Sequence, residues 1–178
     1  MRSQSGFTLI EAMTALAVML LCLALAAPGL SRFLLAQQLR SHAQAVAGVL
    51  HYARGEALRG NRPVYLCAAN LKRNLQLQGC ARQRQVWDAG ILAYADRGGG
   101  GTGAYDSQER LHLLVFAAGK LRMRVGRDQL QFMANGRLER GQGARLLLES
   151  PLSGQCLTLT VSGHGRPDIG EVRGDCPA

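Results

Sequence analysis

The pattern of apolar and polar residues divides the chain into three segments with different predicted structures. Residues 7–30 form an apolar run in which Glu11 and Cys22 are the only ionisable side chains. A run of this length can cross a bilayer, which takes roughly 20 residues in a helix. A carboxylate inside such a run costs on the order of 2.5–3.5 kcal/mol on insertion scales. Glu11 therefore needs a partner and is a candidate functional residue.

Residues 31–60 carry apolar side chains at intervals of three or four, which place them on one face of a helix. These residues are Leu35, Leu39, His42, Val46, Val49, Ala53 and Ala57. Gly60-Asn61 followed by Pro63 is a helix stop signal. The pattern predicts that the helix of residues 7–30 continues to about Arg59 and that a folded domain covers one side of its second half.

Residues 61–178 contain short apolar runs bounded by Gly, Asn and Asp, which indicate β-strands. The predicted strands are 64–68, 75–78, 91–95, 111–116, 121–125, 130–133, 144–149 and 157–161. The predicted fold class is therefore α+β, with the long helix packed against antiparallel β-sheet in a sandwich-like domain.

Composition limits the chemistry that the chain can perform. The 178 residues carry a formal net charge of +9, and most of the 21 basic residues are Arg. An Arg-rich surface suits a polyanionic partner, but a GC-rich genome that uses Arg for any solvated cation explains the composition equally well. The four His residues have no nucleophile and orienting acid nearby in sequence, so the chain is not predicted to be an enzyme or to hold a cofactor.

Four of the five cysteines lie beyond the apolar run, at Cys67, Cys80, Cys156 and Cys176. Four cysteines allow three disulfide connectivities, and the local pairing Cys67–Cys80 with Cys156–Cys176 is favoured. Disulfides indicate an oxidising compartment such as the periplasm. A zinc site is the alternative, but the chain lacks the C-x₂-C spacing typical of one, and no metal site is predicted.

The chain starts with a polar leader, residues 1–5, followed by Gly6-Phe7-Thr8-Leu9-Ile10-Glu11. This segment resembles the class III signal of type IV pilins and type II secretion pseudopilins. In that family, prepilin peptidase cuts after the glycine (here Gly6) and N-methylates the new first residue (here Phe7). The resemblance implies that Glu11 neutralises the new amine of a neighbouring subunit in the filament core, where a low dielectric strengthens the pairing.

Two other interpretations of the N-terminal run remain open. One is a secretory signal peptide with Ala24-Leu25-Ala26 as its cleavage site, although the helical pattern continues past that site. The other is a simple single-span anchor, which leaves Gly6 and Glu11 unexplained.

The resemblance implies a domain organisation and a location. It implies a leader peptide at 1–6, a transmembrane or filament-core helix at 7–30, an amphipathic helix half at 31–60 and a β-rich periplasmic domain at 61–178, which is the lollipop architecture of pilins. The protein would be a single-pass inner-membrane protein that reaches the filament tip on assembly. Its partners would be prepilin peptidase, other minor and major pilins or pseudopilins, and the inner-membrane assembly platform.

A second, narrower resemblance covers the rest of the chain. Ala53-Arg54-Gly55-Glu56-Ala57 at the helix end, a following strand that ends in Cys67, and Trp87-Asp88-Ala89-Gly90 are similar to the GspH/FimT family of minor pilins. The family implies a subunit that initiates or caps a type IV pilus or a type II secretion pseudopilus.

Some members of that family take up DNA through a C-terminal Gly-Arg-x-Arg motif. Gly165-Arg166 matches the first half of the motif, but Asp168 stands where the second Arg belongs. An acidic residue repels phosphate, which weakens the case for DNA binding by the tail alone. The candidate DNA contacts are Arg166 and Arg173 in the tail, with Arg122, Arg124, Arg127, Arg137, Arg140 and Arg145 in the domain. The alternative is a structural C-terminal loop, pinned by Cys176, with Arg166 in a salt bridge.

The glycine-rich segment at residues 98–103 predicts a surface loop. Asp96, Asp106 and Glu109 flank this segment and could hold Ca²⁺ through their oxygen atoms if the loop folds back. Their spacing matches no calcium motif, so this site is a minor alternative.

Overall fold

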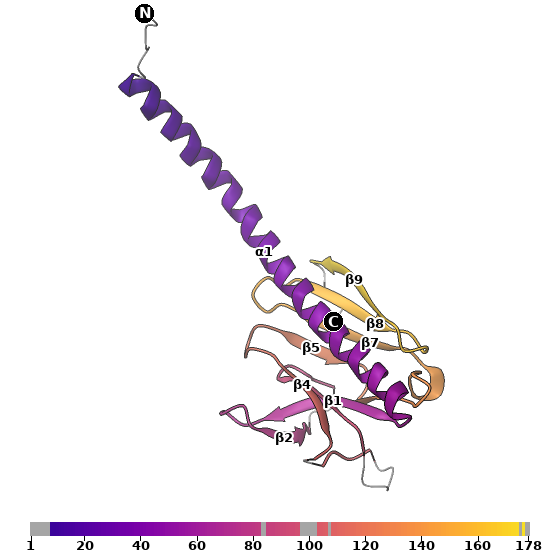
Figure 1. Ribbon diagram of the computed structural model, residues 1–178. Helices are drawn as coiled ribbons and strands as arrows, with labels where there is room; N and C mark the ends of the chain where they lie inside the picture. Colours follow the sequence, from indigo (N-terminus) through magenta and orange to yellow (C-terminus); the bar gives the residue numbers. More distant parts are fainter. Residues whose placement is uncertain (1–7, 83–84, 97–102, 107, 175, 177–178) are drawn as a thin grey trace, which may run out of the picture. The chain divides into compact units, whose positions relative to one another are not determined.

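The computed structural model describes residues 8–82, 85–96, 103–106, 108–174 and 176. The chain divides into two compact units, residues 1–35 and residues 36–178, and helix α1 (Leu9–Gly60) contributes to both (Figure 1). In the first unit, large apolar side chains such as Leu9, Met13 and Leu21 are more than 60% exposed. No single helix among the described residues qualifies as a membrane span, but the bent pair Leu9–Leu25 and Gly29–Gly60 qualifies jointly by length and composition.

The second half of α1 buries one face in the core of the second unit. Its buried apolar side chains are Leu39, Ala43, Val46, Ala47, Val49, Leu50, Ala53 and Ala57. Five positions of the predicted stripe are among them, which confirms the helical spacing. The helix ends at Gly60, where Asn61 adopts a left-handed φ of 45° and the Arg62 N–H donates to Ala57 O at 3.3 Å. This is an ordinary way to satisfy the last carbonyls of a helix.

Two antiparallel sheets complete the second unit (Figure 1). The first sheet has the order β2 (Leu77–Cys80), β1 (Val64–Leu71), β3 (Gly90–Tyr94) and β4 (Arg110–Val115), and β6 (Gln129–Phe132) also pairs with β1. The second sheet has the order β5 (Arg122–Val125), β7 (Ala144–Glu149), β8 (Cys156–Val161) and β9 (Pro167–Arg173). A short 3₁₀-helix, η1 (Glu139–Gly141), precedes β7. One hydrophobic cluster joins the helix to both sheets, which confirms the predicted α+β class.

Two sequence predictions about the strands are wrong. A strand was expected at 75–78, but Leu75 has a left-handed φ of 61° and lies in the turn before β2. The C-terminal segment, expected to be a loop, forms strand β9. Pro167, Asp168 and Gly170 are poor strand formers, yet they are tolerated because β9 is an edge strand. Its register shifts by one residue opposite Thr158, so Ile169 and Val172 both face the core although they are three residues apart.

The Trp87-x-x-Gly90 segment links the two sheets. Trp87 is fully buried, and its backbone N–H donates to Met123 O on β5 at 2.8 Å. The Asp88 carboxylate accepts a hydrogen bond from the Met123 N–H at 2.7 Å. Gly90 then begins β3 with a φ of 147°, and a Cβ there would lie 2.1 Å from Leu114 O. A side chain at this position is therefore excluded both by conformation and by space.

We expect Gly90→Ala to lower the free energy of unfolding by on the order of 3–5 kcal/mol, because the Cβ collides with backbone that cannot move freely. The measurement is urea unfolding of the full chain in detergent, with circular dichroism as the signal. Gly119→Ala is the matched control, because Gly119 also has a positive φ (72°) but no atom within 4 Å of its Cβ position. The control should lose only about 1–2 kcal/mol, and equal losses in the two variants would contradict the steric explanation.

Candidate assembly and binding surfaces

Glu11 lies in the first turn of α1, three residues after Thr8. The Thr8 hydroxyl accepts a hydrogen bond from the Glu11 N–H at 3.4 Å, and the Thr14 hydroxyl donates to Glu11 O at 3.0 Å. Thr8 is thus the N-cap of α1, and Glu11 is at its N3 position. The Glu11 carboxylate is exposed and makes no ion pair with a described residue. The predicted processing residues Gly6 and Phe7 lie outside the described residues.

The apolar side chains around Glu11 are not covered by other described residues of the first unit. The exposed side chains include Leu9, Ile10, Met13, Leu16, Val18, Met19, Leu20, Leu21 and Leu23, which surround the helix. A helix that is apolar on all sides is stable only when other helices or lipid cover it. This surface, with a single carboxylate in it, is the candidate assembly surface.

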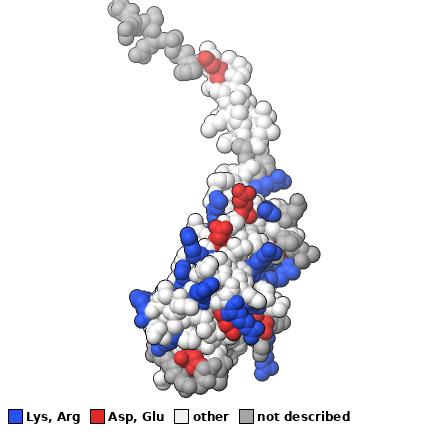
Figure 2. Space-filling model, turned by 90° about the vertical axis from the view of Figure 1, so that its right-hand side faces the viewer, with Lys and Arg blue, Asp and Glu red and all other residues white. Residues whose placement is uncertain are grey.

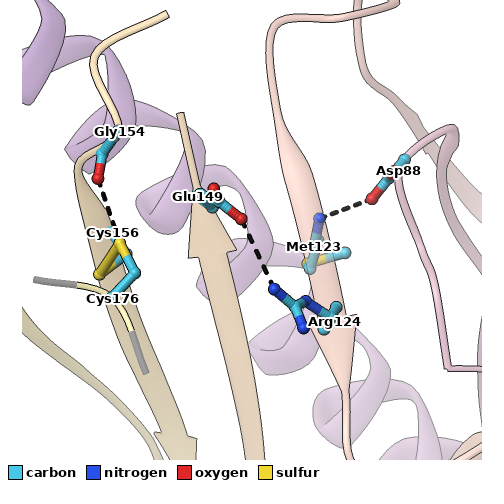
Figure 3. A network of polar contacts seen from close by, with 7 residues as sticks. All are labelled: Asp88, Met123, Arg124, Glu149, Gly154, Cys156 and Cys176. Atoms are coloured by element: carbon cyan, nitrogen blue, oxygen red, sulfur yellow. Dashed lines mark hydrogen bonds and ion pairs between the residues drawn. A yellow bond between two sulfur atoms is a disulfide. The ribbon is translucent and has the colours of Figure 1, made fainter. Parts of the chain in front are cut away.

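The four cysteines of the second unit form two local disulfides, Cys67–Cys80 and Cys156–Cys176. The first joins β1 to β2, and the second joins β8 to the residue that follows the end of β9 by three positions. Figure 3 shows the second disulfide beside Gly154, whose carbonyl oxygen lies 3.2 Å from Cys176 Sγ. Both bridges tie a strand at the edge of a sheet to its inner neighbour.

Three tyrosines cover the outer face of the first sheet, a cluster that the sequence analysis missed. Tyr94 stacks on Tyr65 and meets Tyr105 edge-on, with ring centroids 5.5 and 5.3 Å apart. The Tyr94 hydroxyl donates to Gly103 O at 2.6 Å, and the Gln129 amide donates to both oxygens. Burial raises the pKa of Tyr94 to about 12, although the hydrogen bond from Gln129 acts in the opposite direction. The uninterrupted apolar run of β3 was the available signal, because it indicates a strand covered on both faces.

The second sheet carries arginines on its outer face. Arg122 and Arg124 alternate with buried residues of β5, and Arg122, Glu149, Cys156 and Arg173 form one cross-strand row. Arg124 forms an ion pair with Glu149 at 3.8 Å (Figure 3). A groove of about 670 Å³ runs along β8 on this face, with Arg145 and Arg173 among its lining residues. The structure thus brings together four of the candidate DNA-contacting arginines, Arg122, Arg124, Arg145 and Arg173.

Arg166, the candidate in the terminal Gly-Arg motif, is located elsewhere. It lies in the turn before β9, at the opposite end of that strand from Arg173, and its N–H donates to the Ser162 hydroxyl at 3.2 Å. Arg166 makes no salt bridge with a described residue, contrary to the expectation for a purely structural tail. On the face drawn in Figure 2, Lys and Arg outnumber acidic side chains but are interspersed with them.

Gly165 has a structural explanation of its own. Its φ is 79°, and a Cβ there would lie 2.3 Å from Gly136 O and 3.3 Å from Arg54 Cδ. Arg54 in turn donates from Nε to Gly136 O at 3.1 Å. Arg54 therefore holds the end of the helix to the turn after β6, and Gly165 packs against both. This role was missed because the helical pattern placed Arg54 outside the buried stripe.

The calcium alternative finds no support in the described part of the chain. No group of three or more His, Cys, Asp or Glu side chains that could hold a metal ion is found among the described residues. The Asp96 carboxylate instead accepts from the Gly103 N–H at 3.1 Å, and the Glu109 carboxylate accepts from the Asp106 N–H at 3.0 Å. Residues 97–102, which include most of the glycine-rich segment, lie outside the described residues.

Two family profiles match the sequence. The family described as type II transport protein GspH matches residues 42–165, and the prokaryotic N-terminal methylation motif matches residues 1–27. No curated protein matches the chain.

Among solved structures, the fold is similar to the type IV minor pilin FimU of Pseudomonas aeruginosa in two crystal forms. The P21 form has a TM-score of 0.56 at 20% identity and covers 79% of this chain and 96% of FimU. The P65 form has a TM-score of 0.54 at 18% identity and covers 78% and 99%. At a sequence identity of 18–20%, this structural similarity supports a conclusion about the fold alone.

The tyrosine cluster predicts a pH dependence of stability. The pKa of Tyr94 is higher in the folded chain (about 12) than its ordinary value of 10.0. Unfolding therefore releases a proton above pH 10, and stability should fall as the pH rises from about 10 to about 12. Chemical unfolding of the full chain at a series of alkaline pH values measures this loss.

Tyr94→Phe should reduce the alkaline loss of stability, whereas Tyr52→Phe, which alters a ring outside the cluster, should not. An unchanged pH profile in Tyr94→Phe would show that other groups control alkaline unfolding.

Proposed function

Since this chain belongs to the GspH family of type II transport proteins and is a minor pilin or pseudopilin, we propose that it initiates or caps a filament after proteolytic processing. The filament is a type IV pilus or a type II secretion pseudopilus. Processing consists of cleavage between Gly6 and Phe7 and N-methylation of Phe7 by prepilin peptidase. The partners are other minor and major subunits and the inner-membrane assembly platform.

The observation that carries this proposal is a lone carboxylate on a helix that is apolar on every side. The N-cap at Thr8 accounts for the start of the helix at Leu9 but leaves the charge of Glu11 unpaired among the described residues. Burying that charge among apolar helices without a cation would be costly. Cleavage after Gly6 supplies such a cation, the amine of Phe7, and we assign this amine on a neighbouring subunit as the partner of Glu11.

Two further features support the proposed location. The exposed apolar surface of the first unit suits the bilayer before assembly and the filament core after it. The two disulfides of the second unit suit an oxidising compartment, so we place residues 36–178 in the periplasm of the processed protein.

A second candidate function is DNA binding during uptake by natural transformation. The outer face of the second sheet favours it, because Arg122, Arg124, Arg145 and Arg173 lie there. The terminal motif does not favour DNA binding, because packing explains Gly165 and Asp168 replaces the second Arg. Glu149 and Glu171 also lie on the arginine face and weaken its attraction for phosphate.

We expect mass spectrometry of the assembled protein to find an N-terminus at Phe7 that carries one added methyl group. In Glu11→Ala the same N-terminus should form, but the variant should be lost from sheared filament fractions by about tenfold or more. The physical reason is that the Phe7 amine then has no carboxylate partner in a low-dielectric core.

Thr14→Ala is the matched control, since it removes a neighbouring polar side chain without changing charge, and it should assemble normally. A mature N-terminus at Ala27 would identify a secretory signal peptide and end the proposal. Normal assembly of Glu11→Ala would remove the role assigned to Glu11.

For the second candidate, gel shifts of the full chain in detergent should show an affinity for duplex DNA that falls steeply with salt. Arg122→Ala with Arg124→Ala should reduce the slope of log affinity against log salt concentration by about 2. Arg59→Ala, whose side chain pairs with Glu56, should leave the slope unchanged. Binding that is insensitive to salt, or unaffected by the double variant, would rule out this surface.

A further inference from the structure

We propose that the tip of the β1–β2 hairpin is a docking site, where Leu75 inserts into an apolar pocket rimmed by carboxylates on a neighbouring subunit. The tip consists of residues 72–76. The proposal rests on the proposed function, since a neighbouring subunit exists only if the chain assembles.

The first observation is the backbone of Leu75. Its φ of 61° belongs to the left-handed region, where the Cβ of a bulky residue is strained. The turn holds this conformation with three hydrogen bonds. The Leu75 N–H donates to Lys72 O and the Lys72 N–H to Gln76 O, each at 2.9 Å, and the Gln76 N–H donates to the Asn74 carboxamide oxygen at 3.2 Å. Gly or Asn would adopt this conformation at lower cost.

The second observation is that the fold does not use the Leu75 side chain. It is 63% exposed, whereas Leu71 and Leu77 on either side of the turn pack against the tyrosine cluster. A single exposed leucine is ordinary on a protein surface. Leu152 is such a residue: it is 59% exposed in the β7–β8 turn without a positive φ. A strained backbone that carries an exposed leucine is not ordinary, and strain of this kind concentrates at functional sites.

The third observation is the surface around the tip. An open cleft of about 730 Å³ borders it, lined by Lys72, Leu75, Gln76, Leu77, Gln78, Tyr105 and Arg110. The lining contains two cations and no carboxylate, and Arg73 adds a third exposed cation beside it. None of these three cations forms an ion pair with a described residue. Apolar groups at the centre and charges at the rim are the usual anatomy of a protein interface.

Charge complementarity identifies the partner. Three cations that have no ion pair within the described residues, placed around a leucine, fit a surface whose apolar pocket is edged by Asp or Glu. A second copy of this chain would bring like charges together at the tip. A nucleic acid would use the cations but would gain nothing from Leu75. The strained leucine therefore favours a different subunit with an acidic, apolar surface.

The test separates stability from assembly. Leu75→Asn relieves the strain, so the midpoint of thermal unfolding of the full chain in detergent should be unchanged or higher. The same variant should be processed normally but recovered from sheared filament fractions at about one tenth of the wild-type level. Leu152→Asn makes the same chemical change at an unstrained turn and should match the wild type in both measurements. If Leu75→Asn assembles like the wild type, the inference is wrong.

Charge reversal and cross-linking identify the partner. Lys72→Glu with Arg73→Glu should reduce assembly to a similar extent, without a change in thermal unfolding. A photoreactive phenylalanine analogue at position 75 should cross-link to another filament subunit, and mass spectrometry should map the adduct next to Asp or Glu. Cross-links to lipid, to nucleic acid or to a second copy of this chain would each overturn the assignment. Wild-type protein that is absent from the filament would contradict the proposed function itself and not this site alone.

Discussion

The packing of the second half of α1 against both sheets is the interaction on which the rest of the structure depends. One cluster contains the buried helix face and the inner faces of the two sheets, including Leu66 of β1 and Leu146 of β7. Ala43, Ala53 and Ala57 are fully buried in the helix, where their small side chains fit into the close-packed core. The same cluster also contains Trp87, Phe116 and Leu138 from the connecting segments, so the helix and these residues together bury the inner faces.

Hydrogen bonds from side chains to the backbone, together with glycines, hold the layers in register around that core. Asp88 bonds the segment before β3 to β5, and Arg54 bonds the helix to the turn after β6. Gly90 and Gly165 are points of close approach, where a Cβ would meet a carbonyl oxygen. The disulfides instead secure the edge strands of the two sheets. Strand β2 has four residues and β9 contains a proline and a bulge, and each is secured by a bridge to its inner neighbour.

This arrangement separates the surfaces that the protein offers to partners. The apolar first unit carries the proposed contact between subunits, with Glu11 as its only carboxylate. The second unit presents the arginine face of the second sheet and the cationic hairpin tip, which belong to different sheets. A rigid core with exposed turns allows such surfaces to vary independently, because turns tolerate changes that the core does not. Membership in the GspH family is consistent with this division of labour, since the N-terminal methylation motif and the GspH match cover largely different parts of the chain.

The sequence by itself determined the features that depend on local spacing and on composition. The helical stripe, the stop at Gly60, the positions of seven strands to within three residues and the α+β class follow from periodicity, because burying one face imposes a fixed repeat. The local pairing of the four cysteines and the processing motif were also available from the sequence. The features that depend on contacts between residues distant in sequence could not be predicted from the sequence. Strand β9 was missed because its bulge breaks the alternation of Ile169 and Val172, and Leu75 was misplaced because the strain of a left-handed turn is invisible in a hydrophobic pattern. Only the tertiary structure showed that Arg54 and Gly165 meet at Gly136 and that Arg122, Arg124 and Arg173 share a face while Arg166 does not, since pairing between strands decides which side chains become neighbours.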